Sequence, residues 1–301
     1  MEKFKEILFL KSLKRVGKVT IYEKYWEILT NSNGLDDLIL NIQNHDPKFN
    51  DNDLQKIKKL VETSYENINN SDIDVITVFD KNYPQQLNVM GNKRPLALYI
   101  KGNPESMLKP NIAVIGTRKP SNLSHEFENE VVKEIINTSN RVVVSGLALG
   151  CDKIAHQTSV DENKPTIAIL PSGVDVIKPA KHKKLAEQII ETGGCLISEY
   201  EPNKSAFKST YVERDQIVAA FSDATFVVEC GIKSGTMHTV EAAKKFGKQI
   251  FSYLPNNINK GEYEGNKFIL ENNFNAIPVE SIDKFLDDLK NINVNNSIYN
   301  S

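Results

Sequence analysis

From Asn111 onward, the sequence repeats one unit: a short apolar run, a glycine-bearing turn, and a stretch with helical spacing of apolar residues. Two units stand out, Asn111-Ile-Ala-Val-Ile-Gly-Thr-Arg118 and Arg141-Val-Val-Val-Ser-Gly-Leu-Ala-Leu-Gly-Cys-Asp152. Apolar strands that alternate with amphipathic helices are typical of a parallel sheet covered on both faces. Ligands bind at the carboxyl edge of such a sheet, where N–H groups at helix starts attract phosphate. The sequence therefore predicts an anion-binding edge that carries Arg118.

The alternation sets the expected element boundaries. Candidate strands are residues 112–116, 141–145, 166–170, 195–198, 225–229 and 249–253. Candidate helices are residues 122–138, 151–160, 181–191, 210–221, 235–246 and 266–272. We therefore expect an α/β fold with an extended Rossmann-like parallel sheet and helices on both faces, spanning residues 71–290.

The N-terminal part of the chain has a different pattern. Residues 1–70 show helix-period apolar positions, which predict a small all-α domain that is SAM-like or a degraded helix-hairpin-helix. Arg15-Val-Gly-Lys-Val contains a single glycine, so an ordinary helix connection is favoured there over a DNA-backbone turn. Short β-like runs follow at 75–79 and 96–100, and residues 291–301 are expected to form a polar tail.

Composition limits the function classes. The chain has 37 Lys and Arg against 39 Asp and Glu, so any nucleic-acid site must be a local patch. Three cysteines in apolar or helix-start contexts suggest a reducing cytoplasm rather than a disulfide framework or a metal cluster. No apolar run is long enough to span a membrane, and the N-terminus lacks the features of a signal peptide. We expect a cytoplasmic protein without membrane contact.

Two turns supply the first candidate ligands. Gly116-Thr-Arg118 lacks the full G-x-G-x-x-G spacing, which argues against a dinucleotide cofactor, and we expect none. Ser145 and Gly146 end the next strand and meet Arg118 at the same edge. A hydroxyl, glycine N–H groups and a guanidinium can clamp a phosphodiester without catalysis. The alternative is that the glycines only permit tight turns.

Three further features point to the same edge. Lys178, Lys181, Lys183 and Lys184 form the densest basic run, which either neutralises phosphates or is a solvated face. The loop with Lys233, Ser234, Gly235 and Thr236 precedes a helix and offers N–H and hydroxyl donors.

The third feature is the helix entrance that begins near Phe207. Tyr211 or Phe207 is a candidate for base stacking and Arg214 for a phosphate contact, with core packing of Tyr211 as the alternative. Asp152 and His156 lie four residues apart on one helix face, but no suitable nucleophile accompanies them. For this pair we favour a structural interpretation, in which Asp152 caps the helix start and His156 is held by hydrogen bonds.

Residues from about 74 to 280 resemble the DNA-processing protein A (DprA/Smf) family. The matching motifs are Tyr83-Pro-Gln-Gln-Leu87, Leu98-Tyr-Ile-Lys-Gly102, Ala113-Val-Ile-Gly-Thr-Arg118, Val144-Ser-Gly-Leu-Ala-Leu-Gly-Cys-Asp152 with His156, Gly194-Cys-Leu-Ile-Ser-Glu-Tyr200, and Ser234-Gly-Thr236 with Thr239. The resemblance implies a non-enzymatic protein that binds single-stranded DNA, forms a homodimer and helps to load the RecA recombinase in natural transformation or recombination.

The sequence also departs from the family pattern. The family's Phe-Pro-x-Arg-Asn-Arg motif corresponds here to Tyr211-Val-Glu-Arg-Asp-Gln216, so one arginine is kept and Gln216 replaces the second. Many family members end in a winged-helix domain, for which we find no room after residue 290. This looks like a divergent branch of the family.

Two alternatives stay open. One is a nucleotide sensor or a phosphoribohydrolase-like enzyme of the related Rossmann group, for which Glu229 and Glu241 are the candidate carboxylates. Their positions relative to the loop do not match the spacing typical of those enzymes. The other is a DprA-derived component of a phage-defence or mobile-element system.

Overall fold

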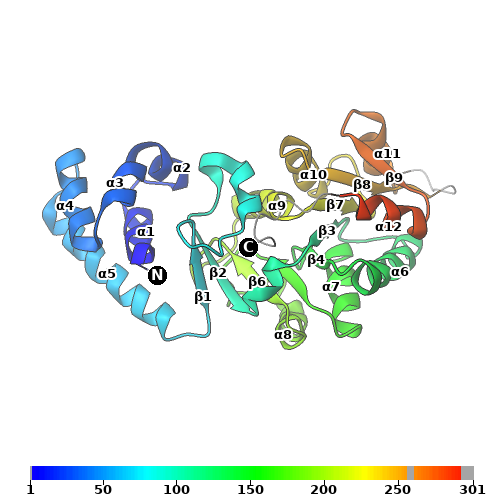
Figure 1. Ribbon diagram of the computed structural model, residues 1–301, viewed down its shortest axis with the longest axis horizontal. Helices are drawn as coiled ribbons and strands as arrows, with labels where there is room; N and C mark the ends of the chain where they lie inside the picture. Colours follow the sequence, from blue (N-terminus) through cyan, green and yellow to red (C-terminus); the bar gives the residue numbers. More distant parts are fainter. Residues whose placement is uncertain (1, 256–260, 293–301) are drawn as a thin grey trace. The chain divides into compact units, whose positions relative to one another are not determined.

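The computed structural model describes residues 2–255 and 261–292 of the chain. Contacts divide the chain into two compact units (Figure 1). The N-terminal unit comprises residues 1–83 and 90–99, and the main unit comprises residues 84–89 and 100–301. The predicted polar tail lies outside the described residues from position 293 onward.

Short helices make up most of the N-terminal unit. They are α1 (Glu2–Ser12), α2 (Lys18–Thr20), the π-helix η1 (Ile21–Tyr25), α3 (Trp26–Asn31), α4 (Leu35–His45) and α5 (Asp51–Asn69). Helix α5 begins at a side-chain cap, because Asn50 accepts a 2.9 Å hydrogen bond from the Asp53 N–H. Its buried Leu54, Val61 and Ile68 recur every seventh residue, so one stripe of the helix faces the core.

Strand β1 (Asp74–Thr77) follows α5 in the same unit. The Asp80 carboxylate accepts 2.7 Å hydrogen bonds from both the N–H and the hydroxyl of Thr77, which closes the turn after the strand. The 3-10 helical segment η2 (Gln85–Lys93) then leads to β2 (Ala97–Gly102). The Val78 N–H donates to the Leu96 carbonyl, which joins the two strand regions.

A parallel sheet forms the centre of the main unit. Its strands are β3 (Asn111–Ile115), β4 (Val142–Ser145), β5 (Thr166–Ile169), β6 (Cys195–Ser198), β7 (Ala224–Val227), β8 (Gln249–Tyr253) and β9 (Ala276–Val279). They pair in parallel in the order β6-β5-β4-β3-β7-β8-β9. The chain therefore builds the sheet outward from β3 to β6 on one side and returns to pair β7 on the other side of β3.

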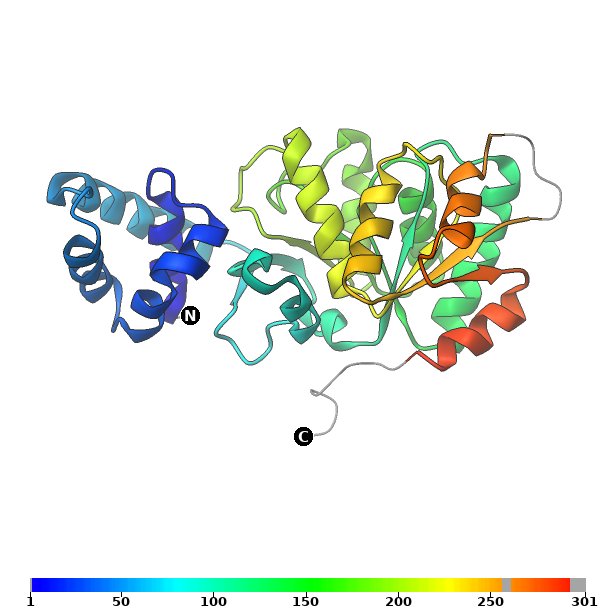
Figure 2. The same ribbon diagram turned by 90° about the horizontal axis from the view of Figure 1, so that it is seen from above.

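Helices cover both faces of this sheet (Figures 1 and 2). One face carries α6 (Asn122–Thr138), α7 (Cys151–Asp161), α8 (Lys183–Glu191) and α12 (Ile282–Lys290). The other face carries α9 (Lys208–Phe221), α10 (Thr236–Lys245) and α11 (Glu264–Glu271). The 3-10 turns η3 (Pro104–Leu108) and η4 (Ala180–His182) complete the described elements of the unit.

These elements confirm the predicted α/β class and the parallel sheet with helices on both faces. Each predicted strand and helix of this unit coincides with an observed one, with small shifts at the ends. Strand β9 was not predicted, because Pro278 interrupts its sequence pattern and strands with proline are confined to sheet edges.

Candidate functional site

A pocket of about 490 Å³ lies where β3, β4 and β7 end. This is the point where the strand order reverses, with β4 on one side of β3 and β7 on the other. Open parallel sheets bind ligands at such a switch point because the loops diverge there. The predicted site residues that line the pocket are Arg118, Gly146, Tyr211, Arg214, Ser234, Gly235 and Thr236.

The turn after β3 is tied to both neighbouring turns by its backbone. The Thr117 N–H donates to the Glu229 carbonyl over 2.7 Å, and the Cys151 N–H donates to the Thr117 carbonyl over 3.1 Å. The Thr236 hydroxyl donates to the Gly116 carbonyl over 2.9 Å. A Cβ at Gly116 would lie 2.4 Å from the Cys151 sulfur, so only glycine fits this approach. Arg118 is exposed in this turn and lines the pocket.

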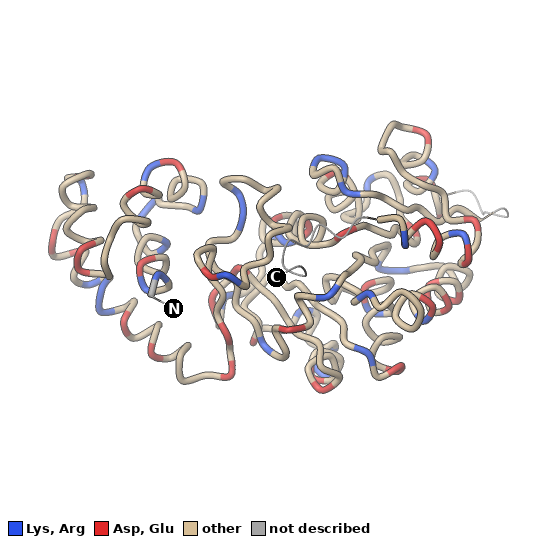
Figure 3. The backbone as a smooth tube through the Cα atoms, in the orientation of Figure 1, with Lys and Arg blue, Asp and Glu red and all other residues tan. Residues whose placement is uncertain are grey.

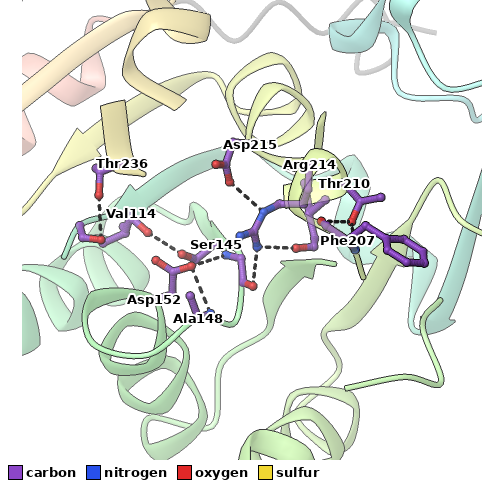
Figure 4. Close-up of polar contacts among 12 residues, drawn as sticks. Val114, Ser145, Ala148, Asp152, Phe207, Thr210, Arg214, Asp215 and Thr236 are labelled. Carbon is purple, nitrogen blue, oxygen red and sulfur yellow. Dashed lines mark hydrogen bonds and ion pairs between the residues drawn. The ribbon is translucent and has the colours of Figure 1, made fainter. Parts of the chain in front are cut away.

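Asp152 organises the turn after β4. One of its carboxylate oxygens accepts hydrogen bonds from the N–H groups of Gly146 and Ala148, at 3.1 and 3.2 Å (Figure 4). Burial raises the pKa of Asp152, and the charge of Arg214 and these N–H groups offset part of the shift. The carboxylate therefore holds the loop in shape.

His156 is fully buried behind this turn and does not line the pocket. Its Nδ1 lies 2.8 Å from the Thr166 hydroxyl, which itself donates to the Val143 carbonyl, so Nδ1–H is the donor. Burial lowers the pKa of His156 to about 3, so the ring is neutral at physiological pH. The hydrogen bond to Thr166 agrees with the structural interpretation of His156. Asp152 does not cap the helix start as expected: Gly150 is the N-cap of α7 and has no side-chain cap, and the Asp152 carboxylate bonds instead to the turn before the helix.

Arg214 is built into the floor of the pocket. Its side chain is 6% exposed, and it donates to the carbonyls of Gly146 and Ile169 and to the Asp215 carboxylate (Figure 4). A Cβ at Gly146 would collide with the guanidinium, which explains the glycine. We predicted that Arg214 contacts a phosphate. In the structure, most of its hydrogen-bonding capacity is already used by these protein groups.

Ser145 is fully buried and does not line the pocket. Its hydroxyl donates to the Val114 carbonyl over 2.7 Å, so it links β4 to β3 inside the sheet. The structure therefore does not bring the Ser145 side chain to the edge where we expected it to contact phosphate. Gly146, its neighbour, does reach that edge.

The predicted basic run lies beside the pocket rather than in it. Lys178, Lys181, Lys183 and Lys184 are all exposed, but none lines it. Between them, the buried His182 places Nδ1 2.9 Å from the Leu147 carbonyl, which holds the start of α8 against the turn after β4. The lysines therefore extend from the flank of the pocket, and Lys233 is exposed in the loop just before Ser234.

The helix entrance at α9 supplies a cation that the sequence analysis did not select. Lys208 begins the helix and lines the pocket together with Tyr211, one turn later. Their spacing of three residues is a signal that they share a helix face. Phe207 is 68% exposed, does not line the pocket, and points away from the Arg214 cluster (Figure 4).

The other lining residues with polar side chains that were not predicted as ligands are Thr117, Asp152, Asp215, His238 and Thr239. The half-buried Asp215 has a raised pKa because of burial, and the paired Arg214 offsets part of that shift. The pocket thus combines two exposed cations, Arg118 and Lys208, with carboxylates that bond to the protein.

The carboxylates considered for hydrolase chemistry lie elsewhere. Glu229 is buried and accepts hydrogen bonds from the N–H and the hydroxyl of Ser121, at 2.9 and 2.8 Å. Glu241 is exposed on α10, and neither residue lines the pocket. Among the residues that the structure describes, no group of three or more His, Cys, Asp or Glu side chains is placed to hold a metal ion. In the same described ranges, every helix is too short or too polar to cross a membrane.

Comparison with known proteins identifies the family. Residues 74–290 match the model of the DNA recombination-mediator protein A family. Protein Smf of Borreliella burgdorferi is 31% identical over 199 residues, which cover 65% of this chain and 62% of that protein. The chain matches about half to two thirds of the length of the first curated relatives.

Solved structures show the same fold. DNA processing protein A from Helicobacter pylori is 28% identical with a TM-score of 0.64, over 73% of this chain and 96% of that one. The protein of that name from Streptococcus pneumoniae is 24% identical with a TM-score of 0.73, over 91% of this chain and 99% of that one, and shows the fold alone. The chain belongs to the DNA recombination-mediator protein A family, the DprA/Smf family that its motifs resemble.

Proposed function

We propose that the main unit binds single-stranded DNA at the pocket where β3, β4 and β7 end. The observation that carries the proposal is the meeting of exposed Arg118 and Lys208 with the loop before α10 at one switch point. Phosphate contacts from cations and backbone N–H groups hold a nucleic acid without reading its sequence. The related protein from Helicobacter pylori is described for its single-stranded DNA binding mode, which supports the same ligand here.

Within the pocket, each group has a distinct part in the proposal. Arg118 meets a phosphate as a bidentate donor, and the N–H groups of Gly235 and Thr236 meet the same or the next phosphate. Tyr211 lies half-buried beside Lys208 and offers a ring for base stacking. Arg214 attracts the phosphate through its charge, which lies under the Gly146 turn, while its N–H groups bond to the protein.

We propose that the bound DNA strand continues from the pocket over Lys178, Lys181, Lys183 and Lys184, the lysine run at the start of α8. These four side chains are exposed and flank the turn after β4, so a strand that leaves the pocket in that direction meets them next. Blue and red segments are interspersed along the backbone tube (Figure 3), and the net charge is only −2. Binding therefore depends on these local groups rather than on the field of the whole protein.

We further propose that binding proceeds without catalysis. A general base needs a free carboxylate or imidazole within reach of the ligand. Here Asp152 is bonded to backbone N–H groups and Asp215 to Arg214. Glu229 and Glu241 lie outside the pocket. The exposed His238 imidazole does line the pocket, but no carboxylate that could act as a free base accompanies it there. This arrangement supports a binding role over a carboxylate-dependent hydrolase.

The family membership supports two further parts of the proposal: that the chain forms a homodimer, and that it passes single-stranded DNA to the RecA recombinase during transformation or recombination. Light scattering coupled to size-exclusion chromatography tests the dimer. Co-purification with RecA, with and without oligo-dT, tests the second part.

Fluorescence anisotropy tests the ligand. Labelled oligo-dT, a duplex of equal length and unlabelled nucleoside monophosphates are compared at low ionic strength. We expect oligo-dT to bind tighter than the duplex and the nucleotides to compete weakly. Arg118→Ala should weaken oligo-dT binding, whereas Lys290→Ala, an exposed cation on α12, should not.

Each other result has a meaning. No binding of oligo-dT at low salt contradicts the proposal. Tight binding of a mononucleotide with weak binding of oligo-dT favours a nucleotide sensor instead, since one pocket of this volume accommodates a single nucleotide.

A further inference from the structure

Three aromatic rings form a stack at the surface of the N-terminal unit, here called the Trp26 stack: Tyr22, Trp26 and Phe79. The Tyr22 and Trp26 ring centroids lie 4.9 Å apart, and the Trp26 and Phe79 centroids lie 5.2 Å apart with planes inclined by 11°. The Arg94 guanidinium lies 5.3 Å from the Tyr22 centroid and 5.9 Å from that of Trp26. Rings from two helical elements and from the turn after β1 thus meet beside one cation.

Core packing does not account for the stack. On the same helical segment, Tyr25 and Leu29 are buried and supply the core. Tyr22 and Trp26 are only partly buried, and Phe79 is 36% exposed. Aromatic rings gain most when they are removed from water, so an ordered stack that stays partly in water leaves a stacking surface open to a ligand.

The backbone under the stack is also unusual. Tyr22 lies in the π-helix Ile21–Tyr25, and Trp26 begins the α-helix that follows. Single π-helical turns are rare, and they occur frequently at functional sites.

The charges near the stack are of both signs, and the cations among them favour an anionic ligand. Glu23 and Glu27 adjoin Tyr22 and Trp26 in sequence, and the Glu23 carboxylate accepts a 3.1 Å hydrogen bond from Asn92. Arg94 donates from Nε to the Tyr22 hydroxyl over 3.1 Å, which fixes the guanidinium beside the rings. Lys93 and Lys81, next to Arg94 and two residues after Phe79, are exposed. The Asp80 carboxylate is used by the Thr77 turn. Stacking rings beside fixed cations are the elements with which proteins hold single-stranded nucleic acid.

We propose that the Trp26 stack is a second contact for single-stranded DNA, on the N-terminal unit and separate from the pocket of the main unit. A base stacks on the exposed side of Phe79 and extends the stack, and the phosphate beside it is attracted to Arg94. The inference shares its ligand with the proposed function and adds a site that the pocket does not include.

Trp26 makes the test specific, because it is the one tryptophan among the 301 residues. Its emission is followed while oligo-dT is added to the full chain, and anisotropy of the labelled oligonucleotide is recorded in parallel. We expect oligo-dT to change Trp26 emission in a saturable way. Phe79→Ala should weaken that response by roughly tenfold in affinity, the effect of losing one base-stacking ring.

Two further variants separate the sites. Arg118→Ala, which alters only the pocket, should leave the Trp26 response to oligo-dT in place, and Arg94→Gln should weaken it. Leu60→Ala is the matched control, since Leu60 is an apolar residue of the same unit that is 68% exposed. Circular dichroism of each variant checks folding.

Binding by anisotropy without any change in Trp26 emission refutes the second site and leaves the proposed function intact. A response equal in Phe79→Ala and wild type also refutes it. Failure of oligo-dT to bind by either signal refutes both proposals. A response to a proline-rich peptide but not to oligo-dT assigns the stack to a peptide and overturns the inference.

Discussion

At the scale of single residues, two arginines near the pocket have opposite roles. Arg214 is buried and bonded to two backbone carbonyls and to Asp215, whereas Arg118 is exposed. Arg214→Ala would leave Asp215 as an unpaired, largely buried charge, which costs about 3–5 kcal/mol of unfolding free energy. Arg118→Ala should change stability by less than about 0.5 kcal/mol. Urea denaturation of both variants measures the difference.

Arg214→Lys serves as the intermediate case. It keeps the charge but loses the planar fork that serves two carbonyls and a carboxylate, so its stability should fall between those of wild type and Arg214→Ala. Equal stability of Arg214→Ala and Arg118→Ala would contradict the structural role assigned to Arg214.

His156 links stability to pH. Its pKa is about 3 in the folded chain because of burial, against roughly 6.5 when unfolded. The unfolded state therefore binds the proton first as pH falls, and stability is lost from about pH 6.5 downward. By pH 5 the loss from this residue reaches about 2 kcal/mol. His156→Asn keeps a donor for Thr166 but cannot titrate, so its unfolding free energy should fall less between pH 7.5 and pH 5.

The pKa of a buried carboxylate such as Asp152 is shifted upward instead. Its effect on the pH dependence of stability is the same in wild type and in His156→Asn. The difference between the two plots of unfolding free energy against pH therefore reports the His156 imidazole alone. Parallel pH profiles for wild type and His156→Asn would show that His156 is protonated in the folded chain, contrary to its buried position.

The sequence predicts which residues come to the edge better than how their side chains point. Spacing after a strand places Arg118, Gly146 and Ser234 correctly at the pocket. It cannot tell that the Ser145 hydroxyl turns into the sheet, because that depends on the Val114 carbonyl of a neighbouring strand. Lys208 is a single cation at a helix entrance, so its local sequence signal is weaker than that of the basic run at 178–184.

At the scale of elements, apolar periodicity predicts the sheet and helices of the main unit closely. Strands buried on both faces are near-continuous apolar runs, and amphipathic helices lie between them, so each change of period marks a boundary. Strand β9 lacks that signal because it lies at the sheet edge and contains Pro278. Where an edge strand pairs is decided by its neighbour β8, which the local sequence does not report.

The glycines of the turns separate into two kinds at this scale. A Cβ at Gly116 would lie 2.4 Å from the Cys151 sulfur and 3.0 Å from the Glu229 carbonyl oxygen, so Gly116→Ala would force β3 and α7 apart. Gly235 has no atom within 4 Å of such a Cβ. We expect Gly116→Ala to cost about 1–3 kcal/mol of unfolding free energy, as overpacking does. Gly235→Ala should leave stability within about 0.5 kcal/mol of wild type.

Thermal unfolding of the two variants decides this point. A stable Gly116→Ala protein with an unchanged melting temperature would mean that the two elements separate at little cost. In that case the contact between β3 and α7 does not hold the pocket in shape.

At the scale of the whole molecule, charge balance dictates how DNA binding must respond to salt. With a net charge of −2, attraction comes from the few cations that meet phosphates, and each contributes about −0.7 to the slope of log K against log salt for a single strand. Replacing Lys178, Lys181, Lys183 and Lys184 by Gln should reduce the slope by about 0.7 for each lysine that contacts the strand. A control with Gln at the exposed Lys244, Lys245, Lys267 and Lys290 makes the same change in net charge. If the DNA strand passes over α8, only the variant with Gln at 178, 181, 183 and 184 has a slope of smaller magnitude. An equal decrease in the magnitude of the slope for both variants would mean that net charge sets the affinity. No decrease for either variant would mean that the DNA strand does not pass over the lysine run.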